Sequence, residues 1–214
     1  MHRIVIIDYG MGNLGSIMNM LKKVGAAAEL SERADDILKA DKLILPGVGA
    51  FDNAIKNLHD LGYIEVLTQK VLSEKTPILG ICLGMQLFGL QSEEGHKSGL
   101  GWLDAQTVRF QFEGITENFK VPHMGWNAVR ICKKSPFFSK PDEEHCFYFV
   151  HSFHLQCNNP SDVLTYTHYG CEFTSSVCHK NILGTQFHPE KSHRYGLEFF
   201  NAFAAWTPAT ERKW

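Results

Sequence analysis

Short apolar runs alternate with amphipathic stretches in the first half of the chain. The apolar runs cover residues 4–7, 26–30, 43–45 and 78–81. Continuous apolar runs of this length are typical of strands that are buried on both faces of a parallel sheet. The amphipathic stretches predict a helix over 17–24 and a helix in two pieces over 52–75, interrupted at Gly62. We therefore expect an α/β fold with a central, mostly parallel sheet and helices on both faces.

The pattern changes in the second half, where strand-like segments follow one another with Gly, Pro and Asn between them. These segments cover residues 105–112, 128–131, 147–150, 163–168 and 182–187. They predict antiparallel strands added to the sheet. A last helix is expected over 195–206, with phenylalanines along one side. Because no repeat, low-complexity tract or linker interrupts the chain, we expect one domain over 1–206 and a polar, frayed tail over 207–214.

Composition narrows the function classes. The 214 residues suffice for a substantial core, and a net charge of −2 gives no reason to expect nucleic acid or an anionic membrane as partner. The six cysteines form no C-x-x-C pair, so zinc spacing is absent and no metal is expected. The residues before the first apolar run show no charged-then-apolar pattern, and no apolar stretch reaches about 20 residues, so neither a leader nor a membrane span is expected. A cytoplasmic protein with reduced thiols is expected.

A glycine-rich loop follows the first predicted strand. Gly10, Gly12 and Gly15 have the G-x-G-x-x-G spacing of a dinucleotide site. Glycines at such positions also serve as a tight turn between a strand and a helix. The turn is the favoured interpretation, and the spacing alone leaves the nucleotide site open.

The chemistry-bearing segment is Gly80-Ile81-Cys82-Leu83-Gly84, between the strand at 78–81 and a helix expected over 85–90. It is the thiol version of the nucleophile elbow, in which glycines let strand and helix approach closely. The start of the helix is expected to stabilise a thiolate through its free N–H groups and dipole. The Leu83 N–H is expected to face an oxyanion. The other five cysteines are interpreted as small buried hydrophobic residues.

A thiol nucleophile needs a base with an orienting partner, and His188-Pro189-Glu190 supplies both. Side chains at i and i+2 of an extended chain lie on the same side, so Glu190 is expected to reach the His188 ring. Pro189 is expected to hold the pair by fixing the intervening φ. Most other histidines are expected to be structural or surface residues, with His151 the exception.

These segments resemble the class I, or triad, glutamine amidotransferases. Within that family, five further segments are similar to the glutaminase subunits of imidazole glycerol phosphate synthase. They are Asp8-Tyr-Gly-Met-Gly-Asn13, Leu45-Pro-Gly-Val-Gly-Ala-Phe51, Pro122-His-Met-Gly-Trp-Asn127, Tyr148-Phe-Val-His-Ser152 and His188-Pro-Glu-Lys-Ser192. The resemblance runs in order from Ile4 to Lys191. It implies a flavodoxin-like fold, and it favours the turn over the nucleotide site at Gly10.

The resemblance implies a triad of Cys82, His188 and Glu190 that hydrolyses L-glutamine through a cysteinyl thioester. It also implies further roles: an oxyanion hole from Val48 and Leu83, glutamine-binding positions at Gly49, Gln86, His151, Ser152 and Phe153, and a partner interface at Trp126, Asn127 and Lys191. No cofactor is implied. The implied partner is a (β/α)₈ synthase subunit in a heterodimer, which uses the ammonia to build imidazole glycerol phosphate in histidine biosynthesis.

Two departures leave the ammonia acceptor open. Phe153 stands where relatives carry tyrosine, so a hydrogen bond to glutamine is expected to be lost. His193-Arg-Tyr-Gly196 resembles paralogues whose barrel partner amidates a surface-polysaccharide sugar. Two other functions compete with the glutaminase: a different elbow-type thiol hydrolase, such as a peptidase, and a catalytically silent regulatory protein. The complete triad argues against the silent protein.

Overall fold

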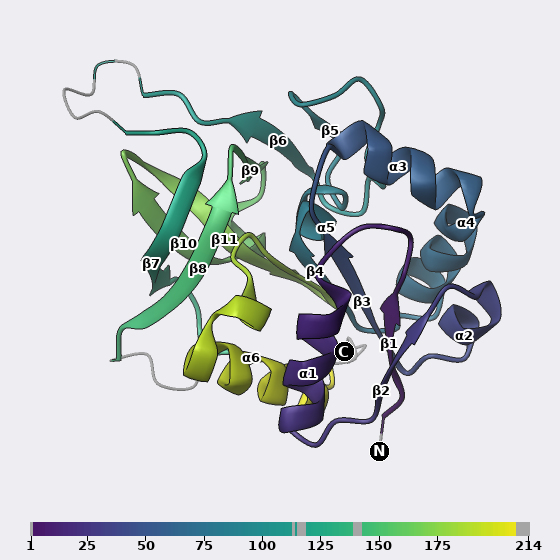
Figure 1. The fold of residues 1–214 in the computed structure, drawn as a ribbon. Coiled ribbons are helices and arrows are strands. Elements are labelled where there is room, and N and C mark those ends of the chain that lie inside the picture. The colour runs from purple at the N-terminus through teal and green to yellow at the C-terminus, as the bar shows by residue number, and fades with distance from the viewer. Residues whose placement is uncertain (1, 113, 115–118, 139–142, 209–214) are drawn as a thin grey trace, which may run out of the picture.

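The computed structural model describes residues 2–112, 114, 119–138 and 143–208, and within them twelve strands form one sheet (Figure 1). Five parallel strands form its first half, in the order β2 (Ala28–Ser31), β1 (Ile4–Ile7), β3 (Lys42–Gly47), β4 (Ile78–Cys82) and β12 (Ile182–Thr185). This is the 2-1-3-4-5 order of flavodoxin-like folds. The predicted fold class is confirmed.

Antiparallel strands extend the sheet beyond β12. They are β11 (Cys171–His179), β10 (Val163–Tyr169), β7 (His123–Ile131) and β8 (His145–His151). A side branch consists of β9 (Phe153–Cys157), which pairs with β11 and with β6 (Ala105–Arg109), and of β5 (Gln91–Ser92) beside β6. The added antiparallel strands expected from the second half are therefore present.

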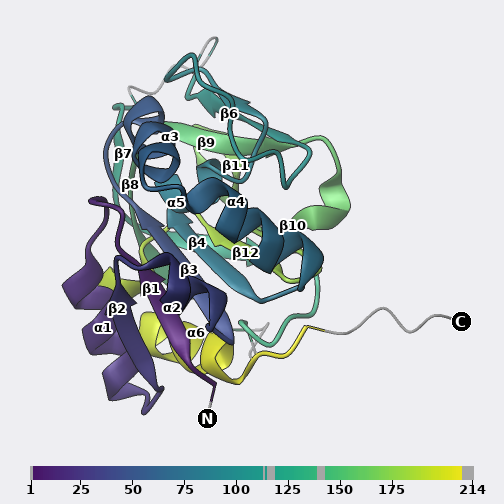
Figure 2. The same ribbon diagram turned by 90° about the vertical axis from the view of Figure 1, so that its right-hand side faces the viewer.

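Alternation within the apolar runs builds a core on each side of the sheet. In β1, Val5 and Ile7 belong to one core, and Ile4 and Ile6 to the other. Helices α1 (Leu14–Lys23) and α6 (His193–Ala205) cover the second core (Figure 2). The first core, which contains Val5 and Ile7, lies under α2 (Ala34–Leu38), α3 (Phe51–Asp60), α4 (Tyr63–Thr68) and α5 (Leu83–Gln86). No helix in the described part of the chain is both long and apolar enough to cross a membrane.

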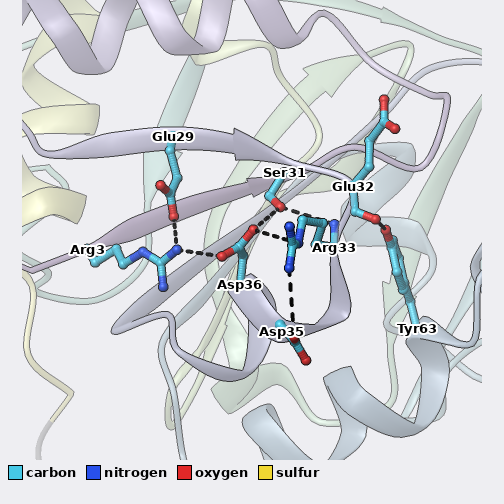
Figure 3. A network of polar contacts seen from close by, with 8 residues as sticks. All are labelled: Arg3, Glu29, Ser31, Glu32, Arg33, Asp35, Asp36 and Tyr63. Atoms are coloured by element: carbon cyan, nitrogen blue, oxygen red, sulfur yellow. Dashed lines mark hydrogen bonds and ion pairs between the residues drawn. The ribbon is translucent and has the colours of Figure 1, made fainter.

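A polar network ties α2 to the edge of the sheet (Figure 3). The Arg3 guanidinium lies between Glu29 of β2 and Asp36 of α2, 2.8 Å from the Asp36 carboxylate. The Ser31 hydroxyl donates to the same carboxylate at 2.7 Å. The Ser31 hydrogen bond and the Arg3 charge lower the pKa of Asp36. These contacts fix a short helix that the hydropathy pattern did not predict.

One predicted element is wrong, and two observed strands were not predicted. The helix expected over 85–90 is wrong, because α5 ends at Gln86 and the chain then turns so that the Leu90 N–H donates to the Ala105 carbonyl of β6. Strands β9 and β11 were not predicted. In β11, Ser175 and Ser176 are fully buried and hydrogen-bond the Thr165 hydroxyl at 2.8 and 2.6 Å. Polar side chains that hydrogen-bond one another can be buried, so a search for apolar runs does not detect such a strand.

The expected tail lies mostly outside the described residues, which end at Pro208. Gly62 interrupts the helical segment as predicted, in a left-handed conformation between α3 and α4. A π-helical turn, η1 (Gln69–Ser73), continues α4, and two short 3₁₀ turns complete the fold, η2 (Pro160–Asp162) and η3 (Pro189–Lys191).

Candidate active site

The carboxyl ends of β3, β4 and β12 lie side by side and open into a cavity of about 330 Å³. Ligands of open parallel sheets bind at this edge. The cavity gathers most of the side chains singled out from the sequence: Val48, Gly49, Cys82, Leu83, Gln86, His151, Ser152, Phe153 and His188. Larger cavities lie elsewhere, among them one of about 570 Å³ lined by Lys42 and Trp206, which holds no thiol among its described lining residues.

Cys82 occupies a strained turn at the end of β4. Its φ of 54° and ψ of −110° lie outside the regions that side-chain-bearing residues favour, at a cost on the order of 1–3 kcal/mol. The glycines on either side are sterically required. A Cβ on Gly84 would lie 1.9 Å from the Leu45 carbonyl oxygen, and one on Gly80 would lie 2.6 Å from the Phe88 ring. The close approach of strand and helix expected for an elbow is therefore present.

Helix α5 is a single turn of four residues. A macrodipole is the sum of many aligned peptide dipoles, so a turn of this length provides little of it. The expectation that the helix stabilises a thiolate is therefore weakened. The nearest cation for the sulfur is His188.

His188 and Glu190 form a buried pair. His188 Nδ1 lies 2.8 Å from Glu190 Oε1, and each side chain is 1% exposed. The expected route to this contact is wrong: the chain is not extended here, because Pro189 begins the turn η3 and the Lys191 N–H donates to the His188 carbonyl at 3.0 Å. Proline suits this first position of a turn, since its missing N–H needs no partner there.

Charge rather than burial sets the ionisation of His188. Burial alone would lower its pKa, but the Cys82 sulfur and then Glu190 outweigh burial and raise the pKa to about 10. His188 Nε2 makes no hydrogen bond of normal geometry within the described residues. The imidazolium therefore lies beside the Cys82 sulfur and holds a transferable proton at neutral pH.

A buried amide pair completes the surroundings of the sulfur. Gln186 Nε2 donates to Cys82 Sγ at 3.6 Å, and Gln86 Nε2 donates to Gln186 Oε1 at 3.0 Å and to the Phe153 carbonyl at 3.0 Å. Gln186 is fully buried. The sequence motifs did not single it out, although it directly follows β12 and lies two residues before His188.

Two neutral histidines support the wall formed by residues 151–153. Burial lowers the pKa of His123 to about 4 and that of His151 well below its usual value. His151 Nδ1 lies 2.8 Å from the Phe153 carbonyl, which can only accept, so Nδ1 carries the proton. His151 Nε2 then accepts from His123 Nδ1 at 3.1 Å. His151 is thus a fixed wall residue, not a second base.

The residues expected at a partner interface do not share one face. Trp126 is 48% exposed and stacks on His193 with ring centroids 5.4 Å apart. Lys191 is exposed, with its Nζ 5.5 Å from the centre of the Tyr148 ring. Asn127 follows Trp126 in β7, so its side chain points to the opposite face, where Nδ2 donates to the His168 carbonyl at 2.9 Å.

Within the described residues, no group of three or more His, Cys, Asp or Glu side chains is arranged to hold a metal ion. The arrangement offers instead a strained thiol, an imidazolium held by a carboxylate and a cavity beside them. These parts suffice for acyl transfer through a thioester.

Comparisons with known proteins agree with this chemistry. Residues 5–205 match the family model described as glutamine amidotransferase class-I. The chain is 48% identical over 200 residues to imidazole glycerol phosphate synthase subunit HisH 2 of Pseudomonas aeruginosa, covering 94% of this chain and 98% of the relative. It is 50% identical over 200 residues, with the same coverage, to the subunit of that name from Methanococcus maripaludis.

Among solved structures, PurLQS from Thermotoga maritima contains a chain with the same fold. Its TM-score is 0.70 at 18% identity, over 96% of this chain and 99% of that one.

Proposed function

The chain belongs to the class-I glutamine amidotransferase family, and we propose that it is the glutaminase subunit of an imidazole glycerol phosphate synthase. It releases ammonia from L-glutamine for histidine biosynthesis. The alternative acceptor, a surface-polysaccharide sugar, gains no support, since the relatives named above carry the imidazole glycerol phosphate synthase name. We propose that residues 1–206 act as one amidotransferase domain in the cytoplasm.

The observation that carries the proposed mechanism is the convergence of Cys82, His188 and Glu190 at one cavity. The Cys82 thiolate attacks the side-chain amide carbon of glutamine, and His188 gives its proton to the departing nitrogen. This step leaves a γ-glutamyl thioester and free ammonia. Water, deprotonated by His188, then attacks the thioester and yields glutamate and the original thiol. Glu190 holds the imidazole ring throughout.

The proposed oxyanion hole consists of the N–H groups of Val48 and Leu83, which lie at the ends of β3 and β4. Val48 is 43% exposed and lies between Gly47 and Gly49, and its N–H belongs to the peptide that it shares with Gly47. A peptide next to glycine rotates at low steric cost. We therefore expect the Val48 N–H to be fixed only when a partner docks over it. One oxyanion donor is worth roughly 10²–10³ in rate.

Glutamine is proposed to bind along the wall opposite Cys82. Gly49, Gln86, His151, Ser152 and Phe153 line the cavity together. Phe153 offers its ring but no hydroxyl, so the main chain of 151–153 supplies the polar groups on this side. The Phe153 carbonyl itself is already occupied by Gln86 and His151.

The proposed partner is a (β/α)₈ synthase subunit that covers the cavity and receives the ammonia. Trp126 and Lys191 are exposed groups close to the catalytic turn, since Lys191 follows Glu190 and Trp126 stacks on His193. An exposed tryptophan is a usual anchor of an interface, and an interfacial lysine contributes through charge pairing. The role of Asn127 stays a prediction, because its amide is turned toward β10.

The test is a steady-state assay of glutamine hydrolysis with and without a histidine-pathway barrel and its ribonucleotide substrate. Cys82→Ala is compared with Cys157→Ala, which removes a thiol from β9 that does not line the cavity. We expect partner-dependent ammonia release and imidazole glycerol phosphate from the wild type and Cys157→Ala only. Equal hydrolysis with and without the barrel would refute the coupling, and activity in Cys82→Ala would refute the nucleophile.

A further inference from the structure

We propose that Gln186 is a positioning residue of this active site, whose side-chain amide holds the Cys82 sulfur with its N–H and the Gln86 amide with its carbonyl. The inference rests on the proposed role of Cys82 as nucleophile. It gives the sulfur a hydrogen-bond donor in addition to the nearby imidazolium of His188.

The backbone around Gln186 is fixed on both sides. The Gln186 N–H donates to the Ser175 carbonyl of β11 at 2.9 Å, and the His188 N–H donates to the Tyr148 carbonyl of β8 at 2.8 Å. Between them, Phe187 turns to the other face and stacks on Phe147 with ring centroids 3.9 Å apart. These contacts hold the segment after β12 so that the Gln186 side chain reaches the Cys82 sulfur.

A chain of hydrogen bonds dictates which end of the Gln186 amide meets the sulfur. The Phe153 carbonyl can only accept, so Gln86 must present its NH₂ group there. The second N–H of that NH₂ group donates to Gln186 Oε1. Gln186 Nε2 is therefore turned toward Cys82 Sγ. The reverse orientation would place an oxygen acceptor against the thiolate and two NH₂ groups against each other.

The same chain determines what Gln86 offers to a substrate. Both N–H bonds of its amide are used, one on Phe153 and one on Gln186. Its remaining polar atom is Oε1, on a residue that lines the cavity. An acceptor at that place suits a ligand group that carries N–H donors, such as the carboxamide or ammonium of glutamine. Gln186 therefore supports both the nucleophile and amide recognition.

Two variants separate these roles. In Gln186→Glu a carboxylate of the same shape still accepts from Gln86 but donates nothing to the sulfur. In Gln186→Met both contacts are lost with little change in volume. Gln156→Met is the matched exposed control on β9, and Asn181→Leu removes a buried amide that donates to the Val71 and Thr76 carbonyls, away from the cavity.

The measurements are the rate of Cys82 alkylation by iodoacetamide across pH, followed by mass spectrometry, and kcat and KM for glutamine in the complex with the barrel. In Gln186→Glu we expect alkylation at pH 7 to fall at least about tenfold, as for the loss of a hydrogen bond to a charged group, with the acid limb moved to higher pH. Its KM should stay within about twofold of the wild-type value. Gln186→Met should show the same loss of alkylation and a KM raised severalfold.

Asn181→Leu should lower the Tm and leave the alkylation profile unchanged, and Gln156→Met should change neither. A wild-type alkylation profile in Gln186→Glu, or an equal shift in Asn181→Leu, would overturn the proposal. If a Gln186 variant fails to fold, Gln186→Asn, whose amide is one methylene too short to reach the sulfur, decides by the same readout. Alkylation needs no turnover, so a wild type that releases no ammonia would refute the glutaminase function separately.

Discussion

Replacing Cys82 by alanine should release the proton of His188. The Cys82 sulfur is the largest of the influences that raise the pKa of this imidazole to about 10, against burial, which lowers it. Without the sulfur, burial opposes Glu190 alone, and we expect the pKa of His188 to fall. Each unit of that fall corresponds to about 1.36 kcal/mol of coupling between the sulfur and the imidazole.

The assay is NMR titration of histidine-labelled protein from pH 5 to pH 10, with His188→Gln to assign the resonance among the eleven histidines. The wild-type imidazole should stay protonated from pH 6 to pH 9, whereas in Cys82→Ala it should lose its proton within that window. Cys157→Ala, which removes a thiol outside the cavity, should titrate like the wild type. An imidazole with a pKa near 6.5 in the wild type, or no change in Cys82→Ala, would refute this coupling.

Three further predictions concern the turn, the carboxylate and the surface. Gly84→Ala should lower the free energy of unfolding by at least about 1–3 kcal/mol, because the added methyl group would collide with the Leu45 carbonyl. Gly15→Ala, whose added Cβ would have nothing within 4 Å, should be neutral or stabilising. Urea titrations measure both variants, and equal effects would contradict the packing argument. Glu190→Gln should lower kcat on the order of 10⁴-fold, because an amide no longer holds the protonated ring, and a change confined to KM would argue against this. Lys191→Ala should weaken the barrel complex by about 2–5 kcal/mol in calorimetry, while Lys22→Ala on α1 should not, and equal losses would exclude a specific contact.

The apolar runs predicted the parallel half of the sheet because parallel strands buried on both faces are usually near-continuous apolar runs. The run Ile4–Ile7 supplies alternate side chains to the two cores, as a continuous apolar tetrapeptide in such a sheet must. Strand β11 was not predicted because Ser175 and Ser176 are polar, although both are fully buried and hydrogen-bond Thr165. Only the three-dimensional pairing reveals that these hydroxyls have partners.

The nucleophile elbow followed from Gly80 and Gly84, since their steric requirement is local. The geometry of the catalytic pair did not: Glu190 meets His188 across a 3₁₀ turn and not along an extended chain. Gln186 illustrates the remaining gap. It lies two residues before His188, but its contact with Cys82 joins residues 104 positions apart, which no local pattern contains.

Affinity labelling tests the central claim most directly. Incubation of the barrel complex with a chlorine-bearing glutamine analogue that alkylates active-site thiols, followed by peptide mass mapping, should give one adduct, on Cys82, with parallel loss of ammonia release. Excess glutamine should protect against labelling. An adduct on any of the other five cysteines, with hydrolysis intact in Cys82→Ala, would contradict the assignment of the nucleophile.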